Sequence, residues 1–159
     1  MRSEMNFMTN GDQIGVAVCV LPANHGRKIV GRVVLDYESR CLRRKRLSTE
    51  GGAAFMVDLP QTISLDPGAA FGLSDGTAIE VTEAHEPVLR IEGDLPRLAW
   101  HIGNRHCPCE IAPNHLVIRA DPVLEDMLGK LGATITKGFS PFRPEGGAYG
   151  HGRTFGHSH

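Results

Sequence analysis

Residues 96–104, PRLAWHIGN, decide the fold that we expect for the second half of the chain. Apolar side chains at Leu98, Ala99 and Ile102 recur at spacings of three and four residues, which predicts a helix with one apolar face. The Gly103-Asn104 pair offers a stop at its C-terminal end. A β-type segment precedes this helix at residues 88–92, so strands and helices are expected to alternate from here onward.

The segments that follow continue this alternation. Short β-type segments at 110–111 and 116–119 flank a turn, which predicts a hairpin. Asp121-Pro122 predicts a second helix, because Asp caps a helix and Pro is tolerated in its first turn. The apolar stripe of this helix consists of Val123, Leu124, Met127, Leu128 and Leu131, and Gly132 ends it. With a last strand at 133–137, the order strand-helix-strand-strand-helix-strand is that of the ferredoxin-like, split βαβ unit.

The first half of the chain has a β-type pattern. β-branched residues dominate 28–37, and a turn at 48–52 joins the segments 40–47 and 53–59 as a hairpin. Short strands at intervals of about 8–12 residues predict a small sandwich or barrel. We therefore expect an α+β protein: a small all-β domain at 1–85, a ferredoxin-like domain at 86–149, and a flexible His-containing tail at 150–159.

Composition excludes several classes of function. The net charge is −1, which does not favour a general nucleic-acid or membrane binder, and no apolar run approaches the roughly 18 residues that span a bilayer. The N-terminus lacks the apolar centre of a signal peptide, so we expect a cytoplasmic protein. No nucleophile elbow, phosphate loop or zinc-protease helix is present, which argues against an enzyme. The basic run at 40–46 is interpreted as a protein-interaction or solvated face in preference to a nucleic-acid site.

Potential metal ligands gather at two places. His101, His106, Cys107 and Cys109 fall within nine positions. The chain ends with three more histidines, His151, His157 and His159, spaced by other residues unlike an expression tag. Imidazole and thiolate suit zinc, copper, iron and nickel, and suit magnesium and calcium poorly. Transition-metal binding is therefore the first functional hypothesis.

The four clustered ligands are not equivalent. His101 and His106 are five residues apart, about 140° round a helix, so we expect His101 to be structural and His106 to project from the helix end. Cys107 and Cys109 share one face of a strand, where they either bind metal or enter the core. His106 is one ligand, and a site needs about four. A two-fold homodimer that brings two copies of His106 together, completed by the tails, meets this requirement.

Three groups of residues resemble a known family. The motifs are HxGNRH at 101–106 followed by Pro108, VLEDML at 123–128, and PFxPExGAY at 141–149. Together they resemble the UreE family of urease accessory metallochaperones. The resemblance implies a partner-binding N-terminal domain, a metal-binding C-terminal domain, and a homodimer that holds nickel(II) through His106. It also implies delivery of nickel to the urease active site in complex with the urease accessory GTPase.

The cysteines leave the choice of metal open. Cys107 and Cys109 are additions to the family pattern, and thiolate favours zinc and copper. The alternative to nickel delivery is a protein-interaction or chaperone module whose tail binds zinc or copper incidentally. A metal-dependent hydrolase is a third hypothesis, for which the segment offers only Glu110 as a general base.

Overall fold

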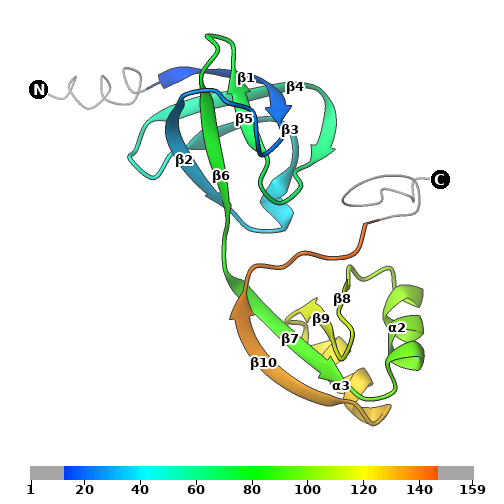
Figure 1. Cartoon of the computed structure of the whole chain (residues 1–159). Helices are drawn as coiled ribbons and strands as arrows, with labels where there is room; N and C mark the ends of the chain where they lie inside the picture. The colour runs from blue at the N-terminus through cyan, green and yellow to red at the C-terminus, as the bar shows by residue number, and fades with distance from the viewer. Residues whose placement is uncertain (1–12, 147–159) are drawn as a thin grey trace, which may run out of the picture. The chain divides into compact units, whose positions relative to one another are not determined.

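The computed structural model describes residues 13–146 (Figure 1). Contacts between residues divide the chain into two compact units, Met1–Glu83 and Ala84–His159. Each unit contains a hydrophobic cluster made of its own residues. The predicted tail at 150–159 lies outside the described residues.

The described part of the first unit is built from strands, as predicted. The strands are β1 (Gln13–Leu21), β2 (Ile29–Leu35), β3 (Cys41–Ser48), β4 (Ala54–Ser64), β5 (Ala70–Leu73) and β6 (Ala78–Glu83), with a 3-10 turn, η1 (Glu38–Arg40), before β3. They form one sheet in the order β2-β6-β5-β1-β4-β3. The β1–β4 and β2–β6 pairs are parallel and the other three pairs are antiparallel, including the predicted hairpin of β3 and β4.

Strand β4 is longer than the sequence indicated. The sequence predicted a strand that ends at residue 59. In the structure β4 continues through Pro60, which has no N–H to donate to a ladder. The pairing of β1 with β4 stops at Val57, and the register of β3 shifts between Leu42 and Arg44. Pro60 therefore lies where neither neighbour needs its missing N–H.

Alternating side chains of β4 form the core of the first unit. Phe55, Val57 and Leu59 are buried, and Asp58 between them is exposed, which is the period of two expected for a strand with one buried face. The Phe55 and Phe71 rings pack edge to face with centroids 5.7 Å apart. Burial of an aromatic side chain of this size stabilises the fold by about 3 kcal/mol. This core fixes β3, which pairs with β4 along its length.

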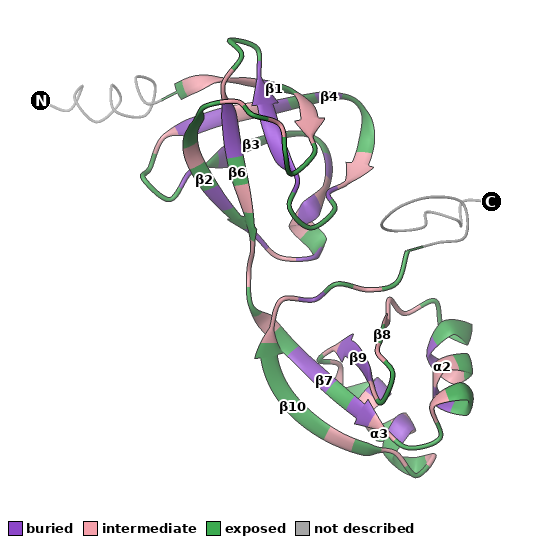
Figure 2. Cartoon of the chain, viewed as in Figure 1, coloured by how far each residue is buried: buried purple, intermediate pink, exposed green. Residues whose placement is uncertain are grey.

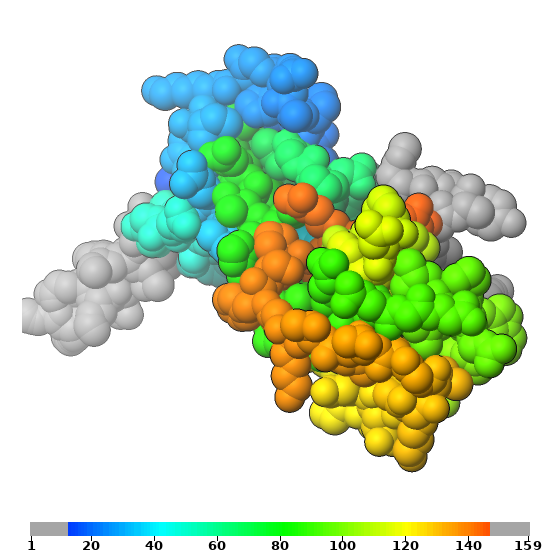
Figure 3. Space-filling view, turned by 60° about the horizontal axis from the view of Figure 1, so that its bottom comes forward, coloured from blue at the N-terminus to red at the C-terminus, as the bar shows by residue number. Residues whose placement is uncertain are grey.

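The second unit has the predicted element order. It runs β7 (Glu86–Glu92), α2 (Leu95–Asn104), β8 (Glu110–Ile111), β9 (Leu116–Arg119), α3 (Pro122–Lys130) and β10 (Thr134–Ser140). The sheet order is β10-β7-β9-β8, and all three pairs are antiparallel. In Figure 3 the orange edge strand β10 lies beside the green strand β7. Strand β9 therefore lies between β7 and β8, as in a split βαβ unit.

Both helices of the second unit are amphipathic and cover the sheet. Leu98 and Ile102 of α2, with Leu124 and Leu128 of α3, are buried in one cluster with residues of β7 and β9 (Figure 2). Neither helix is long and apolar enough to cross a membrane. The burial of α2 fixes where its C-terminal end lies, and that end carries His106, Cys107 and Cys109, the candidate ligands.

The start of α3 is confirmed in detail and its apolar stripe in part. The Asp121 carboxylate accepts hydrogen bonds from the backbone N–H of Val123 (2.9 Å) and Leu124 (3.2 Å). The expectation that Val123 belongs to the stripe is wrong, because its side chain is 69% exposed. One residue is a rotation of about 100°, so Val123 is turned away from the face that Leu124 and Leu128 bury.

Candidate metal centre at the end of helix α2

Helix α2 ends in a Schellman motif. The His106 N–H donates to the Gly103 carbonyl (2.9 Å), and the Cys107 N–H donates to the Ile102 carbonyl (3.3 Å). These are the two bonds that define the motif when Arg105 is the C-cap. The helix stops at Asn104 as predicted, but Gly103-Asn104 does not make the reversal. The chain reverses direction at His106, whose φ is +56°. This conformation turns Cys107 back towards Ile102 and the core, where its side chain packs.

His106 occupies a position that usually belongs to glycine. It is the one non-glycine residue with positive φ among residues 13–146, and its side chain is exposed. The left-handed conformation costs an L-residue about 1–2 kcal/mol, and glycine avoids most of this cost. A strained backbone that presents an exposed imidazole is a local outlier of the kind that marks functional positions.

His101 has a different environment. It lies in the last turn of α2 and is half-buried. Its ring packs edge-on against Trp100, with centroids 5.1 Å apart and an interplanar angle of 88°. Packing within the helix therefore accounts for His101 without a metal.

Cys107 and Cys109 are half-buried and pack against the core of the second unit. The Cys107 Sγ lies 3.5 Å from the Pro108 carbonyl oxygen, and the Cys109 Sγ lies 3.6 Å from the Glu110 carbonyl oxygen. Burial raises the pKa of the Cys107 thiol, and the nearby Asp121 carboxylate raises it further. Burial also raises the pKa of Cys109 to about 11. Both groups are thiols at neutral pH, so binding a metal through sulfur would first release a proton.

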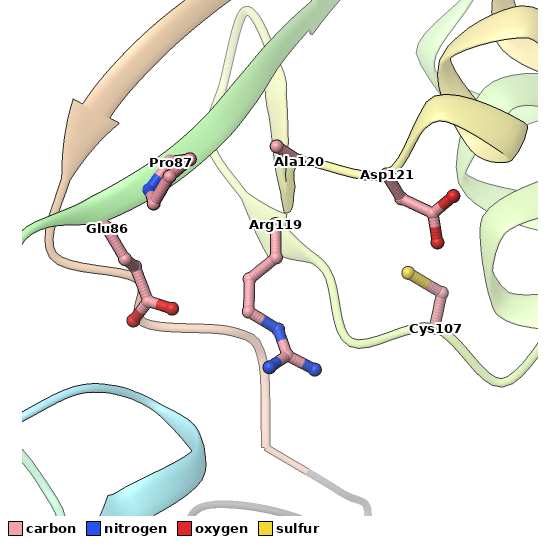
Figure 4. Close-up of a pocket in the computed structure, with 6 residues that line it drawn as sticks. All are labelled: Glu86, Pro87, Cys107, Arg119, Ala120 and Asp121. Atoms are coloured by element: carbon pink, nitrogen blue, oxygen red, sulfur yellow. The ribbon is translucent and has the colours of Figure 1, made fainter.

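A pocket of about 360 Å³ lies beside Cys107. It is lined by Glu86, Pro87, Cys107, Arg119, Ala120 and Asp121. Figure 4 shows the Cys107 sulfur pointing towards the Asp121 carboxylate, while the Arg119 side chain extends between Cys107 and Glu86. His106 does not line this pocket. The imidazole and the thiol of consecutive residues therefore face different surroundings.

The segment after β10 is hydrogen-bonded to the chain next to the candidate ligands. Phe142 is fully buried. The Arg143 N–H donates to the Glu110 carboxylate (3.1 Å), and the Glu145 N–H donates to the Cys109 carbonyl (2.8 Å). Cys109 is three residues from His106, so their Cα atoms are at most about 11 Å apart. Sequence reasoning missed this anchor, although an apolar Phe142 between two prolines was a signal for it.

The predicted ligands are therefore only partly accounted for. His106, Cys107 and Cys109 are described, whereas His151, His157 and His159 lie outside the described residues. Within residues 13–146, no group of three or more His, Cys, Asp or Glu side chains is placed to hold one ion. The imidazole of His106 is the exposed candidate ligand of this region, and the two thiols pack against the core.

Comparison with known proteins identifies the family. Residues 19–84 match the model of the N-terminal domain of the UreE urease accessory protein, and residues 81–159 match that of its C-terminal domain. The urease accessory protein UreE of Rhodobacter capsulatus is 56% identical over 140 residues, covering 88% of this chain and 90% of the relative. The Paracoccus denitrificans protein of the same name is 65% identical over 122 residues, covering 77% of this chain and 79% of the relative.

A third relative extends the same result. The urease accessory protein UreE of Cereibacter sphaeroides is 59% identical over 129 residues, which cover 81% of this chain and 71% of the relative. The two domain models together reach from residue 19 to the end of the chain. On the strength of both domain matches and these identities, the chain belongs to the UreE family of urease accessory proteins.

Proposed function

We propose that this protein acts in urease assembly as a nickel metallochaperone, without enzymatic activity of its own. It binds nickel(II) through His106 at the interface of a homodimer and passes the ion, in complex with the urease accessory GTPase, to the urease active site. The cytoplasm is the proposed location. The family and the names of its members support the role in urease assembly.

The observation that carries the metal assignment is the conformation of His106. Its backbone takes the left-handed geometry that glycine adopts more easily, and its imidazole is exposed to solvent. A metal that must be handed on needs ligands that can be exchanged one at a time. An exposed imidazole at a rigid helix end meets this need, because a neutral imidazole binds nickel and the Schellman bonds hold its backbone in place.

A second copy of the chain supplies further ligands in this proposal. One imidazole is far from a complete coordination shell. A two-fold axis beside His106 would bring the imidazole of the second chain to the same ion. Trp100, on the same helix, is 62% exposed, and tryptophan is enriched where proteins associate. This exposed indole supports an interface at α2.

The C-terminal histidines are the proposed labile ligands. The chain is held beside Cys109 by the Glu145 and Arg143 hydrogen bonds, and His151 is six residues beyond Glu145. Six residues span at most about 20 Å, and the start of this span is close to His106. His151 is therefore within reach of His106 of its own chain.

Calorimetric titration of nickel tests the proposal. We expect His106→Ala to abolish the tightest nickel site while the dimer, measured by light scattering, persists. Deletion of residues 150–159 is expected to weaken the site and leave it measurable. If the deletion removes all metal binding, or if His106→Ala leaves the stoichiometry and affinity unchanged, the alternative of an interaction module with an incidental zinc- or copper-binding tail is correct instead.

A further inference from the structure

Four consecutive cationic residues lie on strand β3. Arg43, Arg44, Lys45 and Arg46 are all exposed, between the buried Leu42 and Leu47. Residues 1–83 contain nine Lys and Arg against ten Asp and Glu, so the first unit is close to neutral. Nearly half of its positive charge is therefore concentrated on one short stretch of strand, which we call the basic edge.

The basic edge has one open side. Strand β3 is the last strand of the sheet in the order β2-β6-β5-β1-β4-β3 and pairs with β4 alone. Among residues 13–146, no backbone hydrogen bond joins 43–46 to a strand other than β4. The turn after β3 does approach β2, since the Glu50 N–H donates to the Arg32 carbonyl (2.8 Å). Backbone donors and acceptors on the outer side of the basic edge thus remain available for another strand.

Only part of the charge is neutralised within the fold. Arg44 forms an ion pair with Asp58 across the β3–β4 pair, with 3.0 Å between Nε and Oδ1. The Arg43 Nε donates to the Leu59 carbonyl (3.2 Å), which leaves its charge uncompensated. Among the described residues, the side chains of Lys45 and Arg46 have no hydrogen-bond or ion-pair partner. At least three positive charges therefore face solvent along the edge.

Protection against aggregation explains part of this pattern. Cationic side chains on an edge strand keep neutral and apolar strands away, and two copies of the same edge repel each other. This protection does not act against an acidic strand, which the same charges attract. Charge complementarity thus selects one class of partner, a negatively charged extended segment.

We propose that the basic edge is the docking strip for an extended acidic segment of a protein partner, which pairs with the open side of β3. Main-chain hydrogen bonds supply the alignment, and the carboxylates face Lys45, Arg46 and Arg43. A protein is favoured over a nucleic acid, because the strip is one strand wide and the carboxylate of Asp58 on β4 lies beside it. This inference involves neither His106 nor a metal, so it stands or falls independently of the nickel proposal.

Binding of a synthetic peptide to the full-length, metal-free protein tests the inference. The probe is a capped, fluorescent decapeptide in which pairs of Glu alternate with pairs of Thr, so that carboxylates lie on both faces of the extended peptide, with a Lys–Thr decapeptide of the same pattern for comparison. We expect the Glu–Thr peptide to bind at low salt and the Lys–Thr peptide not to bind. The double variant K45E/R46E should weaken binding at least about tenfold, because reversing two charges turns attraction into repulsion. The matched variant K28E/K137E has the same net charge at exposed positions elsewhere and should change binding less than about twofold.

Three results would overturn the inference. The first is no difference between K45E/R46E and K28E/K137E. The second is equal binding of a Glu–Thr peptide N-methylated at every residue, because such a peptide keeps its charge but has no backbone N–H to donate to β3. The third is tighter, charge-dependent binding of a twelve-nucleotide single-stranded DNA, which would make the edge a nucleic-acid site. Circular dichroism checks folding, and the milder K45Q/R46Q replaces the double reversal if that variant is unfolded.

Discussion

The helix stop at His106 and the Cys-Pro-Cys segment that follows it are adjacent in the chain and opposite in environment. His106 is exposed and held in a left-handed backbone conformation, whereas Cys107 and Cys109 are half-buried against the core. Burial raises the pKa of both thiols and so keeps them protonated. Residue type makes all three candidate ligands, and of the three the imidazole is the exposed one.

The largest expected effect tests this contrast directly. His106→Ala should lower nickel affinity at least about 100-fold, because loss of a ligand costs more than the 10- to 100-fold typical of an outer-shell change. The double variant C107A/C109A should change nickel affinity less than about threefold. Calorimetric titration at pH 7 measures both. A loss of comparable size in the cysteine variant would show that the thiols are ligands and would remove the contrast.

A second test concerns the backbone of the helix stop. His106→Gly should raise the free energy of unfolding by about 1 kcal/mol, because glycine adopts the left-handed conformation with little strain. His106→Ala keeps the strain and should leave stability nearly unchanged. Urea unfolding followed by circular dichroism compares the two variants. If glycine is no more stable than alanine, the proposed strain at His106 is absent.

A third test uses the thiol of Cys109. The pKa of this thiol in the folded protein is about 11, above its usual value of 9.0, so the folded state prefers the neutral thiol. Stability from this preference is complete below pH 9 and is lost as the pH rises towards 11, because the unfolded chain ionises first. C109A should show a smaller loss of unfolding free energy over this window than the unaltered protein. Equal losses would mean that the thiol is not held in a desolvated environment.

The smallest expected effect concerns the anchor of the C-terminal segment. Glu110→Ala should speed hydrogen exchange at the Arg143 amide several-fold, because that N–H loses its acceptor. Glu110→Gln keeps an acceptor oxygen and should largely restore protection. Glu145→Ala is the matched control, because it removes a carboxylate from the same segment while the Glu145 N–H still donates to Cys109. Equal exchange in all three variants would show that the Glu110 bond does not hold the segment.

Patterns that depend on neighbouring residues could be predicted from the sequence. Asp121-Pro122 caps α3 because the cap uses only the next few backbone amides, and the strand-helix order of the second unit follows from local periodicity. The length of β4, in contrast, depends on distant strands. Pro60 is tolerated inside β4 because of where β1 and β3 stop pairing, and no local pattern contains that information.

The sequence by itself determined that the chain has an α+β fold and that candidate ligands gather around His106 and in the C-terminal tail. Only the tertiary structure separated His106 from the two thiols beside it. Whether a thiol at 107 or 109 faces solvent depends on how α2 packs on the sheet, and whether His106 takes positive φ depends on Cys107 reaching the core behind it. Burial and backbone strain are properties of contacts between distant segments, and those contacts exist only in the folded chain.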